Sequence, residues 1–154
     1  MRHHPAGFFF VSGNDKDSPE DIGKLASALE QGYDFVQGSR YLPGGRHGQM
    51  PLYRQLATRW MHPTLFSLIT GRRITDSTNG FRAVRLNLLD DTRINLQQDW
   101  LNEYELEPYL YLRVIRDGFR VREVPVTKSY PRPALAGTPG EGYTKMRPVA
   151  DWWR

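Results

Sequence analysis

The chain has 154 residues, of which 39% are hydrophobic and 25% are charged, as in one ordinary globular domain, so a largely disordered chain is excluded. Because the sequence contains no cysteine, disulfides, zinc–thiolate sites and a cysteine nucleophile are excluded as well. The net charge is +4 at pH 7, and its positive excess, which lies from Arg120 onward, suits a phosphate, an anionic lipid or a nucleic acid, unless it is only a solvated tail.

The beginning of the sequence predicts a strand, a helix and a second strand. An apolar run at 7–11 predicts a buried strand that runs into a loop. Ser18 as N-cap and Pro19 as the first helical residue predict a helix with one apolar face, which ends at Gly32. A strand at 33–38 follows. Strand, helix and strand at this spacing predict a parallel sheet.

A further helix is predicted after the glycine-rich loop at 42–48. One of its sides is apolar, through Leu52, Leu56 and Trp60. Pro63 is expected to break or kink the helix. The apolar residues that follow Pro63 are too few to span a bilayer, although they could lie on one. The sequence favours the plainer alternative, a helix packed into the core.

The remaining elements begin with a polar turn at 76–79. Apolar positions at i, i+4 and i+8 mark a helix that Gly118 ends, and alternating apolar residues after it mark a strand. A stretch rich in proline and glycine is expected to form a loop. In chain order these elements are a strand at 80–85, a helix through Leu106, Leu110 and Val114, a strand at 119–126 and a loop at 129–144.

Six short motifs occur in one order across nearly the whole chain. They are Pro19-Glu20-Asp21-Ile22, Gly38-Ser39-Arg40-Tyr41 with Gly44-Gly45, Arg54 within a helix, Asp76-Ser77-Thr78-Asn79-Gly80-Phe81-Arg82, Gly118 with Glu123-Val124-Pro125-Val126, and Tyr143-Thr144-Lys145. None is specific alone, but together they resemble the second half of family 2 glycosyltransferases of the dolichol-phosphate mannosyltransferase-like branch. The resemblance implies an α/β fold, part of a GT-A (Rossmann-like) domain with a mostly parallel sheet flanked by helices. Residues 1–154 would then be the C-terminal portion of one domain whose nucleotide-binding half is absent.

The same resemblance implies transfer of a sugar from a nucleotide sugar to a polyprenyl or dolichyl phosphate. An acceptor phosphate is already an anionic nucleophile, so it needs cations that hold it near the sugar more than it needs a general base. The diphosphate that leaves also needs nearby positive charge. We expect a cytoplasmic chain with no nucleic acid as partner, and we leave peripheral contact with a membrane surface open.

Two residues match catalytic positions of the family. Arg40 follows the second predicted strand, and its guanidinium fork can hold a phosphate through two hydrogen bonds. An arginine at a strand end can also be purely structural. Asp76 lies in the turn before the next strand, where it either caps the turn or touches the active site.

Four residues match the family's region around the acceptor phosphate. Arg54 and Thr58 share one face of a helix by their i, i+4 spacing, and an ordinary exposed helix face is the alternative. Arg132 and Lys145 flank the loop rich in proline and glycine. Such a loop could become ordered when the lipid phosphate arrives.

The expected metal site departs from the family pattern. Counting back from Pro19, the two positions of the family's Asp-x-Asp motif are Ser12 and Asn14. Because Mg²⁺ and Mn²⁺, the ions expected from the family, prefer carboxylate oxygens, the usual site is weakened. Asp15 and Asp17 repeat the spacing in a shifted position. They either take over the metal or are exposed acids before a helix.

Two alternatives stay open at this point. Ser12 and Asn14 favour a non-catalytic relative that binds a sugar nucleotide or a lipid phosphate and has lost its metal site. A basic nucleic-acid binder would suit the pI near 9.5, but the basic residues are not interleaved with a stacking aromatic series. Because the nucleotide-binding half is absent, we expect the chain alone to have little or no activity.

Overall fold

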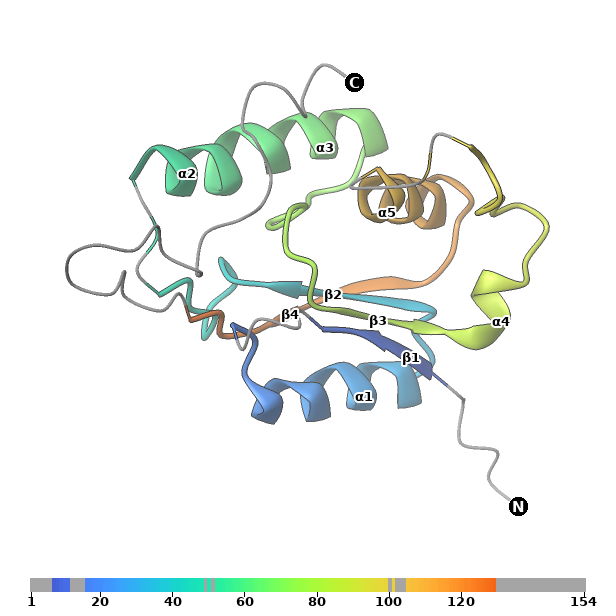
Figure 1. Cartoon of the computed structure of the whole chain (residues 1–154), viewed down its shortest axis with the longest axis horizontal. Coiled ribbons are helices and arrows are strands. Elements are labelled where there is room, and N and C mark those ends of the chain that lie inside the picture. Colours follow the sequence, from blue (N-terminus) through green and yellow to red (C-terminus); the bar gives the residue numbers. More distant parts are fainter. Residues whose placement is uncertain are drawn as a thin grey trace.

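A sheet with helices on both faces forms the centre of the computed structural model, which describes residues 7–11, 16–48, 50, 52–99, 101 and 105–129. Its strands are β1 (Gly7–Phe10), β2 (Phe35–Ser39), β3 (Arg82–Arg85) and β4 (Val121–Pro125). Across the sheet the strands follow the order β1-β3-β2-β4. The helix α1 covers one face, and α2, α3 and α5 lie over the other (Figure 1).

The strand β3 lies between β1 and β2, although β1 and β2 are consecutive strands in the sequence. Ala83 of β3 pairs with Phe9 on one side and with Val36 on the other, and both pairings are antiparallel. Strand β4 runs parallel to β2. The α/β class is therefore confirmed, and the sheet is mixed rather than mostly parallel.

The antiparallel direction of β3 follows from how the chain reaches it. The segment before β3 reaches the end of the sheet where β2 finishes, as the hydrogen bond from the amide of Gly38 to the carbonyl of Phe81 at 2.9 Å shows. The next strand must therefore run back along β2. The connection between β2 and β3 contains a helix at residues 52–70, but it returns to the end of the sheet where β2 finishes, so β3 is antiparallel to β2.

Two apolar layers hold the helices to the sheet. Helix α1 (Ile22–Glu30), entered through the 3-10 turn η1 (Pro19–Asp21), buries Leu25 and Leu29 against one face. Helix α5 (Leu106–Arg116) packs on the other face, where the rings of Tyr111 and Phe35 stack with centroids 5.1 Å apart. The short helix α4 (Leu86–Leu89) contributes Leu88 to this second layer. Burial of each such side chain stabilises the fold by about 1.5–3 kcal/mol.

The helix that was expected to break or kink at Pro63 continues through it. Its parts are α2 (Leu52–Leu56), the π-helical turn η2 (Ala57–Met61) and α3 (His62–Thr70). Pro63 lies in the first turn of α3, directly after the π-helical turn, where a missing amide N–H costs little. Gly71 ends the helix in the left-handed conformation, with φ 66°.

The apolar side of this helix faces outward, so the expectation of a core helix is wrong. The exposed fractions are 69% for Leu52, 63% for Trp60 and 75% for Leu68. Hydrophobic residues exposed singly are common, but a continuous exposed series marks a contact surface. The opposite side packs inward through Phe66, whose ring stacks on that of Tyr111.

Candidate functional site

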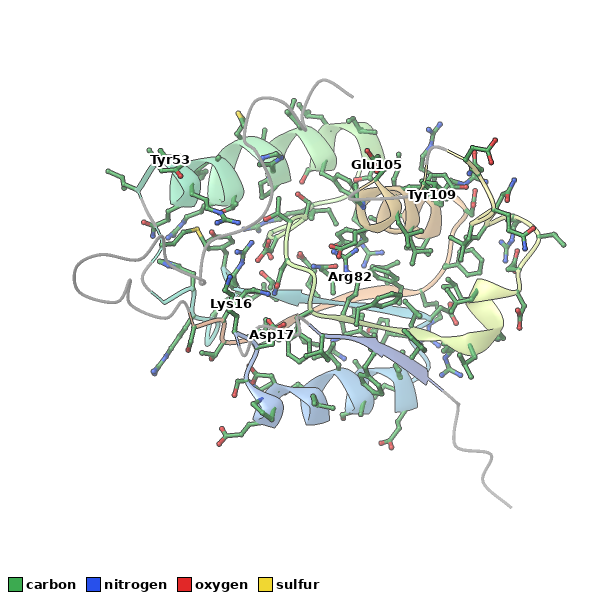
Figure 2. All side chains as sticks on the ribbon, in the orientation of Figure 1. Lys16, Asp17, Tyr53, Arg82, Glu105 and Tyr109 are labelled. Carbon is green, nitrogen blue, oxygen red and sulfur yellow. The ribbon has the colours of Figure 1, made fainter. Side chains whose placement is uncertain are left out.

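Charged side chains gather at the end of the sheet where β1, β2 and β4 finish. Lys16 and Asp17 follow β1, Arg40 follows β2, and Lys128 follows β4. Figure 2 shows Lys16 and Asp17 beside this end of the sheet, between α1 and α2. In open α/β sheets, ligands bind outside the carboxyl ends of the strands.

Arg40 and Asp76, the two predicted catalytic residues, form a buried ion pair. Nε of Arg40 donates to Oδ2 of Asp76 at 2.7 Å, and Nη2 donates to Oδ1 at 2.8 Å. The backbone amide of Arg40 also donates to Oδ2, at 3.1 Å. The guanidinium fork that the sequence assigned to a phosphate is thus directed at a carboxylate. The pair joins the end of β2 to the loop before β3, and a direct part in chemistry stays a prediction.

Glu123 of β4 holds the loop that carries Asp76. Its Oε1 accepts hydrogen bonds from the amides of Thr75 and Asp76, both at 3.0 Å, and its Oε2 accepts the Thr75 hydroxyl at 2.9 Å. Burial raises the pKa of Glu123, while these hydrogen bonds lower it in part. Sequence reasoning missed this role. The sequence feature that could have indicated it is a carboxylate, that of Glu123, within the alternating apolar strand predicted at 119–126.

Lys128 forms a buried ion pair with Asp17. Its Nζ donates to Oδ1 of Asp17 at 2.8 Å and to Oδ1 of Asn79 at 3.3 Å. Burial lowers the pKa of Lys128, and the bond to Asp17 raises it in part. Sequence reasoning missed Lys128 too. It takes the next inward position after Val124 and Val126, which are both buried, so the period-two pattern could have found it.

Lys16 and Arg54 add positive charge close to this ion pair. Lys16 is 5% exposed. Burial lowers the pKa of Lys16, and the positive charges of Arg54 and Lys128 lower it further, whereas Asp17 raises it. Positive groups that repel one another in this way stabilise an anion placed among them.

The predicted pair Arg54 and Thr58 lies on one helix face, as the i, i+4 spacing indicates. The Thr58 hydroxyl donates to the backbone carbonyl of Arg54 at 2.9 Å, and the Tyr41 hydroxyl bonds to the Thr58 hydroxyl. Because Tyr41 follows Arg40 in sequence, this contact ties the helix to the end of β2. The structure thus brings four of the five described candidates, Arg40, Asp76, Arg54 and Thr58, to the end of the sheet where the fifth, Asp17, also lies.

The described part of the predicted metal region does not fit a divalent cation. Asp17 offers one carboxylate, but an ammonium group, that of Lys128, lies 2.8 Å from its Oδ1. Among the residues that the structure describes, no cluster of three or more His, Cys, Asp or Glu side chains could hold a metal ion. The other candidates lie outside the described residues, so their roles stay predictions: Ser12, Asn14 and Asp15 near the metal, and Arg132 and Lys145 around the loop.

Four curated proteins with similar sequences carry names of sugar transferases. The chain is 32% identical to polyprenol monophosphomannose synthase of Mycolicibacterium smegmatis over 143 residues, which is 92% of this chain and 53% of that enzyme. It is also 32% identical to undecaprenyl-phosphate mannosyltransferase of Micrococcus luteus over 117 residues, 76% of this chain and 46% of that enzyme. Dolichol-phosphate mannosyltransferase of Pyrococcus furiosus is 32% identical over 89 residues, 57% of this chain and 25% of that enzyme. No protein-family model matches the chain.

The mixed sheet with helices on both faces, and the charged end of its strands, are consistent with part of a GT-A glycosyltransferase domain. The predicted resemblance to family 2 of the glycosyltransferases, in the branch of dolichol- and polyprenyl-phosphate sugar transferases, is confirmed by these relatives. It spans about half the length of the curated relatives that it matches over most of its own length.

Proposed function

We propose that this chain is part of a glycosyltransferase that transfers a sugar from a nucleotide sugar to a polyprenyl or dolichyl phosphate, and that its described residues bind the acceptor. One observation carries the proposal: Arg54 and an exposed apolar side belong to one continuous helix, α2 to α3. A polyprenyl phosphate joins an anionic head to a long apolar chain, so its binding site needs both chemistries side by side. The names of the relatives support the same class of acceptor.

The reaction would depend on positioning and charge more than on proton transfer. An acceptor phosphate is ionised at neutral pH, and Arg54 would hold its oxygens at the end of the sheet. The departing diphosphate gains negative charge as its bond to the sugar breaks, so cations there stabilise the transition state more than the ground state. Arg40 uses Nε and Nη2 to bond to Asp76, so in the described arrangement it joins the end of β2 to the loop before β3.

An anionic membrane surface is the partner that the outer side of the helix suits. The exposed residues Tyr53, Leu56, Trp60 and Leu65 line an open apolar groove of about 640 Å³. A helix that combines such an apolar side with basic residues lies well on anionic lipids. None of the described helices has the length and apolarity that a membrane crossing requires. The sequence from 41 to 75 holds no acidic residue, and its arginines are Arg46, Arg54, Arg59, Arg72 and Arg73.

Titration with citronellyl phosphate, a short polyprenyl phosphate, tests the proposed acceptor site by calorimetry. Citronellol and inorganic phosphate form separate arms, and each should bind more weakly because it offers only one of the two chemistries. Arg54→Gln should weaken the binding of citronellyl phosphate about tenfold, since a charge-assisted hydrogen bond contributes about 1.5–3 kcal/mol. Arg116→Gln, at the exposed end of α5, removes the same charge elsewhere and should change nothing. Equal binding of citronellol and its phosphate would contradict the proposal.

A non-catalytic module that binds a sugar nucleotide or a lipid phosphate is the second candidate. The ion pair between Asp17 and Lys128 favours it, because that pair takes up a carboxylate of the predicted metal region. Turnover separates the two candidates. A full-length protein that carries this segment should consume nucleotide sugar in the presence of a prenyl phosphate if the first candidate holds. Binding of both substrates without turnover would favour the module.

A further inference from the structure

We propose that Lys128 and Lys16 supply the positive charge for a diphosphate group at the end of the sheet, so that this chain binds the diphosphate without a divalent metal ion. The inference deepens the proposed function and rests on it, because it names how the same site would hold the donor. It also follows from a disagreement: the family's ions need carboxylates, and the described residues in that place present ammonium groups instead.

The position of Lys128 is the first observation. Its side chain is 9% exposed, and that of Asp17 is 1% exposed. The pair connects the segment after β1 with the segment after β4, where Asp17 and Lys128 also form an antiparallel backbone bridge. Two backbone segments therefore fix the ammonium group in one place. A charge held in a fixed place stabilises an anion without reorganising first.

The second observation is that Asp17 is a poor metal ligand in this arrangement. A divalent ion on its Oδ1 would have to approach to about 2.0–2.6 Å, the range for Mg²⁺ and Ca²⁺. The ammonium of Lys128 already lies 2.8 Å from that oxygen. Lys16, which directly precedes Asp17 in sequence, carries a second positive charge close to the pair. Entry of a metal would therefore place like charges together in a buried region.

The third observation is the attachment of Lys128 to the loop before β3. Its Nζ bonds to Oδ1 of Asn79, and Nδ2 of Asn79 donates to the carbonyl of Gly38 at 3.0 Å. The ammonium group is thus linked to the ends of β1, β2 and β4 and to the loop that also carries Asp76. An anionic ligand beside Lys128 would therefore interact electrostatically with all parts of the candidate site.

Calorimetric titration of the whole chain with inorganic pyrophosphate tests the inference, once with EDTA and once with excess Mg²⁺. The expected dissociation constants agree within about threefold. Lys128→Met should weaken the binding of pyrophosphate at least tenfold in both conditions. Lys24→Met is the matched control, because Lys24 also forms an ion pair, with Asp21, and its loss changes the net charge equally. The control should bind pyrophosphate within about twofold of the unaltered chain.

Asp17→Asn separates a site that binds pyrophosphate through lysines from a site that binds it through a metal ion on Asp17. The variant keeps a side-chain oxygen to which Lys128 can donate. With lysines as the cations, removal of the carboxylate should leave pyrophosphate binding equal or stronger. With a metal on Asp17, the same change should abolish binding. Titration with Mn²⁺ alone, followed by the electron paramagnetic resonance signal of the free ion, adds a direct readout, and no loss of that signal is expected.

The outcomes separate the inference from the proposed function. Pyrophosphate binding that requires Mg²⁺, or that Asp17→Asn abolishes, would overturn the inference and leave the proposed function standing. Absence of pyrophosphate binding in both conditions would also overturn the inference, whereas the titration with citronellyl phosphate decides the proposed function. Binding without metal that Lys128→Met removes and Lys24→Met retains supports the inference.

Discussion

The amide of Asp76 donates to Oε1 of Glu123 at 3.0 Å, and this bond sets the position of a carboxylate that in turn holds Arg40. Three side chains from β4, the loop before β3 and the end of β2 thus form one continuous chain of contacts. Oε2 of Glu123 accepts the Thr75 hydroxyl, which is 2.6 Å from the hydroxyl of Ser39. The charged end of the sheet is therefore built on a residue that no predicted role had singled out.

Glu123→Gln should preserve this arrangement better than Glu123→Asp. The amide oxygen of glutamine can accept both backbone N–H groups, and its NH₂ can donate to Thr75 if the hydroxyl directs its own proton toward Ser39. Aspartate keeps the charge but is one methylene too short. The free energy of unfolding should fall by less than about 1 kcal/mol for glutamine and by about 1–3 kcal/mol for aspartate. Urea denaturation measures both, and the reverse order would contradict the role of reach.

The pH dependence of stability offers a second test of Glu123. Burial raises its folded-state pKa above the ordinary value of 4.5. The folded state then binds more protons than the unfolded state between the two pKa values, so this group lowers stability as pH rises through that interval. Glu123→Gln cannot ionise. The variant should therefore gain stability relative to the unaltered chain as the pH rises above 4.5, and a constant difference would contradict the shift.

Removal of either partner of the buried pair Arg40 and Asp76 should destabilise the fold strongly. Arg40→Ala leaves a carboxylate that is 0% exposed without its counter-ion, which costs about 3–5 kcal/mol. Arg40→Ala combined with Asp76→Ala should cost less than the sum of the two single changes, because no buried charge remains unpaired. Arg113→Gln breaks a partly exposed pair with Asp117 and should cost less than about 1 kcal/mol. Thermal unfolding measures the loss of stability in each variant. A loss in the double variant equal to the sum of the two single losses would contradict the coupling between Arg40 and Asp76.

The sequence predicted the elements well and their contacts less well. The strand before Arg40, the strand predicted at 80–85 and the two glycine helix ends at Gly32 and Gly118 are all present. Local patterns specify these features, because apolar spacing and left-handed glycines act within a few residues. The place of β3 between β1 and β2 depends on contacts distant in sequence, which local patterns do not contain.

The candidate site shows the same division. Arg40, Arg54, Thr58 and Asp76 were singled out from motifs, and the structure brings them to one end of the sheet. Their mutual partners were not foreseen, since no spacing rule joins Asp76 to Glu123. The outward direction of Trp60 was also missed. The same apolar spacing serves a buried face and a surface contact, so only the surrounding fold distinguishes them.

Binding to anionic vesicles should require the exposed side of α2 and α3. Leu56→Ser and Leu68→Ser each remove an exposed apolar side chain and should each weaken binding about fivefold, from a loss of about 1 kcal/mol. Co-sedimentation with vesicles of phosphatidylcholine and phosphatidylglycerol measures this, and salt should reduce it. Leu86→Ser, on α4, changes a residue that is 43% exposed outside that surface. An equal loss with Leu86→Ser would contradict a specific membrane face.

Two glycines should respond oppositely to alanine. A Cβ on Gly38 would lie 2.6 Å from the carbonyl oxygen of Phe81 and 2.9 Å from Cγ2 of Val126, so Gly38→Ala should destabilise the fold by at least about 1–3 kcal/mol. Gly23 lies in α1 with no atom within 4 Å of such a Cβ. Gly23→Ala should stabilise by about 0.5–1 kcal/mol through helix propensity. Thermal melting of both variants checks the prediction, and similar effects would contradict it.

The central place of β3 also bears on the order in which the chain becomes structured during synthesis. Strands β1 and β2 have no hydrogen bonds to each other, because each pairs with β3. A nascent chain that has emerged only as far as α3 therefore lacks β3, the described strand that pairs with both. Arrival of residues 82–85 at the ribosome exit would join them in one step, and β4 would close the other edge of β2. Formation of the sheet is thus expected to be abrupt and late, and the apolar strands depend until then on protection from aggregation.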